Sequence, residues 1–157
     1  MAPISPGDAE VALRTFPRRW RALLGAMDVD DPDTDAILRR PGPDGRTALD
    51  CAAAAAATLE SVDGEVRRVV SSDHPTLEPR SAPIARPLDD SLAGIDAAAP
   101  ALAATVAGVA AGDLDREGEV GGRTASVRSL IADAVGEVAD LLRAAEQALR
   151  SGRAAGG

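Results

Sequence analysis

The alanine-rich stretch from Gly45 to Val70, GRTALDCAAAAAATLESVDGEVRRVV, limits the possible folds more than any other part of the chain. Alanine has the highest helix propensity of any residue, and Thr47 followed three positions later by Asp50 is a variant of the capping box that starts helices. The stretch therefore predicts a helix of about six turns, with small residues on part of its buried face that let a neighbouring helix come close. The positions expected to face inward are Leu49, Ala52, Ala53, Ala56, Leu59, Val62, Val66, Val69 and Val70.

Two other stretches carry apolar residues every three or four positions, which is the spacing of one face of a helix. The first should run from about Asp8 to Ala26, with a kink near Pro17, which interrupts the apolar stripe. The second begins near Asp89 and closes at Gly112, and its repeat continues through Pro100, which should bend the helix without ending it. Both stripes predict amphipathic helices that bury one face.

The C-terminal part of the chain predicts one more helix, from the N-cap Ser126 to about Arg150, where Gly152 stops it. A glycine-rich crossing precedes this helix, and only Glu119 to Val120 is expected to be extended there. No stretch of the chain has a convincing strand pattern. The sequence therefore predicts an all-α protein.

Four amphipathic helices with one long connection between the second and third are typical of a four-helix bundle. That connection, residues 71–87, is interrupted repeatedly by proline. An earlier connection, between the first and second helices, has room for one short turn around Asp35 to Arg39. Residues 8–150 should form the bundle, with residues 1–7 as a flexible arm and residues 151–157 as a flexible tail.

Composition excludes several classes of function. The net charge is −8 and all 17 basic residues are arginine, so the chain is a poor ligand for nucleic acid. The longest uncharged run, Ala97 to Gly112, is shorter and less apolar than the roughly 20 residues of a membrane helix, so we expect a bundle helix and no membrane contact. The N-terminus lacks the pattern of a secretion signal, and the single cysteine excludes an intramolecular disulfide. These features predict a cytoplasmic protein.

Few side chains in this sequence suit catalysis. Cys51 falls near the start of the alanine-rich helix, where the helix dipole would lower a thiol pKa, although burial among small residues is the favoured interpretation. Glu137 either leans into the bundle beside the apolar positions of its helix or belongs, with Asp133 and Asp140, to a solvated polar face, and the second interpretation is favoured. The chain has neither the Walker spacing nor a lysine, so it has no phosphate-binding loop.

The segments TFPRRWRALLGAM, RRPGPDGRTALDCAAAAAATLESVDGEVRRVVSSDHPTL and GDLDREGEVGGRTASVRSLIADAVGEVADLL, in this order, resemble the DinB-like superfamily. Within that superfamily the chain is similar to actinobacterial members akin to the N-terminal domain of mycothiol-dependent maleylpyruvate isomerase. The similarity covers about residues 8–150 and rests on the pattern of helices and loops. It implies a four-helix bundle in an up-down-down-up arrangement, a fold in which homodimers are common.

The resemblance also implies a divalent-metal site near one end of the bundle, with one histidine ligand in the second helix and two more ligands in the fourth. Ala54 occupies the position of the second-helix histidine. One alignment places the fourth-helix ligands at Glu137 and Leu141, and the other places them at Ala132 and Gly136. At most Glu137 is kept as a ligand, whereas a catalytic divalent metal normally takes three, so we expect no metal and no other cofactor.

Two classes of function follow from these observations. The favoured one is a degenerate, metal-free bundle that acts as a binding or interaction module, for a small molecule in the old pocket or for a second copy in a homodimer. The alternative is a thiol-dependent transferase or isomerase of the mycothiol type that uses a divalent metal, Glu137 or Cys51. The possible pocket residues are therefore Cys51 and Glu137.

Overall fold

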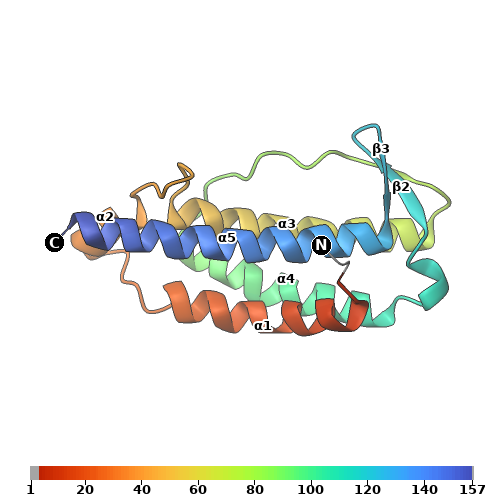
Figure 1. Ribbon diagram of the computed structural model, residues 1–157, viewed down its shortest axis with the longest axis horizontal. Helices are drawn as coiled ribbons and strands as arrows, with labels where there is room; N and C mark the ends of the chain where they lie inside the picture. Colours follow the sequence, from red (N-terminus) through yellow and green to blue (C-terminus); the bar gives the residue numbers. More distant parts are fainter. Residues whose placement is uncertain (1–3, 157) are drawn as a thin grey trace.

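The computed structural model of the chain describes residues 4–156 and shows a bundle of four long helices with one short helix at its end (Figure 1). The all-α four-helix bundle expected from the sequence is confirmed. Each long helix buries one face in a single hydrophobic core. The helices are α1 (Pro6–Leu24), α2 (Pro32–Leu38), α3 (Ala48–Ser71), α4 (Leu88–Gly108) and α5 (Val127–Ala155), and a 3-10 turn, η1 (Ala111–Asp113), follows α4.

The long helices run up, down, down and up in chain order, as the resemblance implies (Figure 1). Because α3 and α4 point the same way, the chain must travel back along the whole bundle between them. Residues 72–87 make this return over the outside of α3. Within residues 4–156, α4 is the one helix long and apolar enough by composition to cross a bilayer, and it packs here between α1 and α3.

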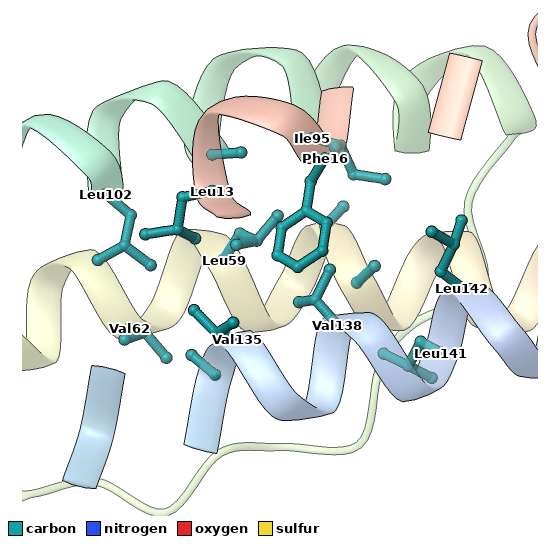
Figure 2. Packing of buried hydrophobic residues seen from close by; sticks show 14 of the residues in the cluster. Leu13, Phe16, Leu59, Val62, Ile95, Leu102, Val135, Val138, Leu141 and Leu142 are labelled. Carbon is teal, nitrogen blue, oxygen red and sulfur yellow. The ribbon is translucent and has the colours of Figure 1, made fainter. Parts of the chain in front are cut away.

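The core is built mainly from alanine, valine and leucine, with Phe16 and Trp20 as its two aromatic side chains. Figure 2 shows Phe16 pointing from α1 into the space between the helices, with Leu59 of α3 and Val138 of α5 nearby. Most positions of α3 expected to face inward are buried, and the exceptions are Leu49 and Val70, which are half-buried at the two ends of the stripe.

Side-chain caps set the starts of α1, α3 and α5. The expected capping box of α3 is present, since the Thr47 hydroxyl accepts from the Asp50 amide at 3.0 Å and the Asp50 carboxylate accepts from the Thr47 amide at 3.0 Å. Ser126 caps α5, as expected. Helix α1 begins at Pro6, two residues before the expected start, because Ser5 is the N-cap and Pro suits the first helical position. Residues 6 and 7 of the expected arm are therefore helical, and residues 1–3 lie outside the described part of the chain.

The predicted end of the last helix is wrong, because α5 continues through Gly152 to Ala155. Gly152 is buried against α2, and a Cβ atom at this position would lie 3.1 Å from the Ile37 carbonyl oxygen and its Cγ2. The glycine permits a close approach of α2 and does not stop the helix. The expected tail, residues 151–157, is thus helical through Ala155, and residue 157 lies outside the described part.

A small three-stranded sheet lies at the end of the bundle opposite α2 (Figure 1). This sheet corrects the sequence prediction, in which no stretch had a convincing strand pattern. β1 (Thr76–Leu77) pairs in parallel with β2 (Glu117–Val120), and β2 pairs with β3 (Arg123–Ser126) in an antiparallel hairpin. Gly121 and Gly122 form the two-residue turn, with φ values of 56° and 78° that glycine adopts without strain. The glycine pair was the available signal, but strands this short carry too little alternation to be recognised.

Arg116 joins this sheet region to the end of α3, and its removal should destabilise the fold. Its guanidinium donates to the carbonyls of Val69 (3.2 Å) and Ser72 (2.9 Å), which the helix itself leaves without partners. We expect Arg116→Ala to lower the free energy of unfolding by about 1–2 kcal/mol, measured by urea denaturation. Arg123→Ala, which changes an exposed arginine of the hairpin, is the matched control and should have little effect.

Candidate functional site

A pocket of about 370 Å³ lies between α3 and α5, beneath the second half of the connecting segment. We call residues 78–87 the strap and this hollow the strap pocket. Its floor is apolar, its rim carries three charged side chains, and the strap forms its cover. The lining residues are Ala53, Ala54 and Leu141 on the floor, Arg46, Asp50 and Glu137 on the rim, and Pro83, Ile84 and Ala85 from the strap.

The structure brings together the three positions of the first alignment considered for the fourth helix. Ala54, Glu137 and Leu141 all line the strap pocket, whereas Ala132 and Gly136 do not. Glu137 and Leu141 lie four residues apart on α5, which places them on one face of that helix opposite Ala54. Of the two alignments, the one through Glu137 and Leu141 places both fourth-helix positions on the lining of this pocket.

Glu137 is paired with an arginine of the strap. The Nη1 of Arg80 donates to Oε2 of Glu137 at 3.3 Å. The same guanidinium donates to both carboxylate oxygens of Glu65 on α3, from Nε to Oε1 at 2.9 Å and from Nη2 to Oε2 at 3.2 Å. The Glu65 side chain is only 10% exposed and that of Glu137 is 48% exposed. Burial lowers the pKa of Arg80, but the hydrogen bond and charge of Glu65 outweigh it, so the pKa is raised. Arg80 therefore remains a cation between the two carboxylates.

A second arginine holds the other end of the strap. Arg86 donates through both terminal nitrogens to the two oxygens of Glu60, at 3.1 and 3.2 Å. Gly94 of α4 leaves room for this pair, because a Cβ atom there would lie 2.8 Å from Oε1 of Glu60. The strap is thus fixed on both sides of the segment that covers the pocket. Sequence reasoning treated this segment as a loop and missed its arginines, since only the fold shows which carboxylates they reach.

Arg46 stands on the pocket rim just before α3. Its Nε donates to Oδ2 of Asp44 at 2.8 Å, while Oδ1 of Asp44 accepts from the Arg46 amide at 3.0 Å. These contacts raise the pKa of Arg46 and lower that of Asp44. Within residues 4–156, the two terminal nitrogens of Arg46 have no hydrogen-bond partner.

The strap pocket does not fit a divalent metal. Its lining offers two carboxylates, Asp50 and Glu137, and no imidazole or thiolate. Asp50 already accepts from the Thr47 amide, and Glu137 already pairs with Arg80. No group of three His, Cys, Asp or Glu side chains within residues 4–156 is arranged to hold a metal ion. This donor set falls short of the three protein ligands that a catalytic metal normally takes.

Cys51 does not belong to the pocket. It is fully buried in the core and does not line the hollow. The expectation that the helix dipole lowers its pKa is wrong, because burial raises the pKa of the thiol from its ordinary value of 9.0 to about 11. Its favoured interpretation, burial among small residues, agrees with the structure.

Cys51 should therefore be slow to alkylate in the folded chain. With a pKa near 11 its thiolate fraction at pH 8 is about a hundredfold lower than in the unfolded chain, and burial slows the reaction further. Since the pKa is higher in the folded state, this group also favours unfolding as the pH rises from about 9 to 11. The alkylation rate by iodoacetamide, with and without denaturant, measures the effect. Equal rates would show that the thiol is not buried.

These features define a class of protein: a four-helix bundle whose long crossing segment covers a pocket between its second and fourth long helices. No family model matches the chain, and no curated protein matches it. Among solved structures the chain is similar to YfiT from Bacillus subtilis, described as a probable metal-dependent hydrolase with an unusual four-helix bundle topology. The TM-score is 0.82 at 12% identity, over 96% of this chain and 89% of that one. At this identity the likeness shows the fold, which is the one implied by the DinB-like resemblance.

Proposed function

We propose that the chain is a metal-free, DinB-like binding protein that takes a small molecule in the strap pocket. The observation that carries this proposal is the convergence of Ala54, Glu137 and Leu141 on an open pocket, in which the charge of Glu137 is already paired with that of Arg80. The space left by Ala54 is not filled by other side chains. An apolar floor with a few charged groups at the rim is the usual composition of a small-molecule site.

The chain's own residues would bind and orient the ligand. Ala53, Ala54 and Leu141 offer apolar contact, and Ile84 of the strap, which is 83% exposed, would lose contact with water when the pocket fills. Arg80 and Arg86 hold the strap in place over the ligand. None of these groups is arranged to transfer a proton or to attack a substrate.

An NMR screen of small molecules against the ¹⁵N-labelled chain tests the proposal. We expect a binder to shift the resonances of Ala53, Ala54 and Ala85, and Ala54→Leu to abolish that binding by filling the floor. Ala97→Leu, which changes an exposed alanine of α4 that does not line this pocket, is the control and should bind as the unmodified chain does. Stoichiometric zinc or nickel that survives dialysis would overturn the metal-free part of the proposal.

The competing proposal is a thiol-dependent transferase or isomerase of the mycothiol type. The burial of Cys51 and its raised pKa argue against that residue as the reacting group. Low-molecular-weight thiols belong in the same screen, because turnover of a thiol conjugate would favour the enzyme over the binding protein.

A further inference from the structure

Among the three charged side chains on the rim of the strap pocket, Arg46 and Glu137 have opposite charges and do not pair with each other. Arg46 precedes α3 and Glu137 lies on α5, and both line the pocket over the floor of Ala53, Ala54 and Leu141. Among residues 4–156 no ion pair joins Arg46 to Glu137, because each is held by a different neighbour. The pocket therefore presents two separate charges of opposite sign beside an apolar surface.

Each of these charges keeps hydrogen-bonding capacity that the protein does not use. Arg46 donates to the Asp44 carboxylate only through Nε, and its two terminal nitrogens have no partner within residues 4–156. Glu137 accepts from Arg80 only through Oε2, and its Oε1 likewise has no partner within residues 4–156. The terminal nitrogens of a guanidinium match the two oxygens of a carboxylate, and a carboxylate oxygen accepts well from an ammonium group. The third rim charge, Asp50, accepts from the Thr47 amide through Oδ2, and its Oδ1 also has no partner within residues 4–156. Asp50 lies only four residues after Arg46 at the start of α3, whereas Glu137 lies on α5 one turn before Leu141, so Glu137 is the anion that can hold the other end of a ligand bound to Arg46.

We propose that the ligand of the strap pocket is a small zwitterion with an apolar side chain, that is, a free apolar amino acid. Its carboxylate would bind the terminal nitrogens of Arg46, its ammonium group would bind Oε1 of Glu137, and its side chain would lie on Ala54 and Leu141. The volume of about 370 Å³ is at the small end of ligand pockets and suits a molecule of this size. This inference rests on the proposed function and names the ligand class of that same site.

Leucine and two analogues with the same isobutyl side chain test the pairing of charges. 3-Methylbutylamine lacks the carboxylate, and 4-methylpentanoate lacks the ammonium group. We expect leucine to bind about tenfold more tightly than either analogue, which is the effect of one charge-assisted hydrogen bond at a half-exposed site. Dissociation constants come from NMR titration of the pocket resonances, at low and at moderate salt.

Variants at the two rim charges assign each contact. Arg46→Gln should remove the preference for leucine over 3-methylbutylamine and keep the preference over 4-methylpentanoate. Glu137→Gln should do the reverse, and Arg80 keeps its two bonds to Glu65 in that variant. The matched controls are Arg143→Gln and Asp140→Asn, an exposed ion pair on α5 that does not line the pocket, and they should change none of the affinities.

The outcomes separate this inference from the proposed function. Equal binding of leucine and either analogue would overturn the zwitterion, since one of the two charges would then be unused. If leucine fails to bind while another small molecule shifts the pocket resonances, the zwitterion is overturned and the binding protein stands. If no molecule in the screen shifts those resonances, both proposals fail.

Discussion

Replacing Ala54 and Leu141 together with histidine is expected to give the chain a divalent-metal site. Both residues line the strap pocket beside Glu137, and residues 137 and 141 share one face of α5. The double variant would supply two imidazoles and a carboxylate, which is the ligand number of a catalytic zinc site with an open position. We expect about one zinc ion per chain to survive dialysis, against none for the unmodified chain.

Arg80 competes with the metal in this experiment, because it pairs with Glu137. Adding Arg80→Gln to the double variant should therefore tighten metal binding further. The control combines Ala54→His with Ala132→His and Gly136→His, which lie outside the pocket and should bind weakly. Cobalt titration followed by absorbance reports the coordination, and circular dichroism reports the fold. Equal affinity of the control would show that the alignment through Glu137 and Leu141 is wrong.

Phe16→Ala is expected to be among the most destabilising single substitutions in the chain. Phe16 is 2% exposed, and it is one of two aromatic side chains in a core that is otherwise rich in alanine. Its removal leaves a cavity among four helices whose small side chains cannot move in to fill it, so the loss should be about 3–5 kcal/mol. A domain of this size is stable by only about 5–15 kcal/mol, so the variant approaches unfolding at room temperature.

Two controls separate the cavity from a general effect of mutation on α1. Phe16→Leu keeps much of the apolar volume and should lose about 1–2 kcal/mol. Val11→Ala removes methyl groups that are 68% exposed and should change stability by less than about 0.5 kcal/mol. Urea denaturation measures all three variants. A loss for Phe16→Ala no larger than that for Val11→Ala would show that Phe16 is not packed in the core.

The parts of the fold that local chemistry controls could be predicted from the sequence. The capping residues Thr47 and Ser126 and the apolar stripes placed the starts and faces of α3 and α5 correctly. The failures depend on tertiary contacts. From the sequence alone, Gly152 indicates the end of a helix, whereas in the structure it allows α2 to pack closely on α5. The pairing of β1 with β2 joins segments about 40 residues apart that carry no local signal for a strand.

In the candidate site, too, helix periodicity predicted some features and tertiary contacts determined the others. The resemblance assigned Ala54 and Glu137 to one degenerate site, and both line the strap pocket, because helix periodicity determines which faces of α3 and α5 meet. It did not predict that Arg80 pairs with Glu137, or that the terminal nitrogens of Arg46 are without a partner in the described part of the chain. Those contacts depend on the path of an irregular segment, which propensity and periodicity do not describe.

The parallel arrangement of α3 and α4 has an evolutionary consequence. The return connection that it requires supplies Pro83, Ile84 and Ala85 to the pocket, and these residues are exposed and take no part in the bundle core. Substitutions in the strap can therefore change what the pocket accepts without changing the packing that holds the helices together. Descendants of one stable bundle can in this way acquire different ligands through a short, structurally undemanding segment.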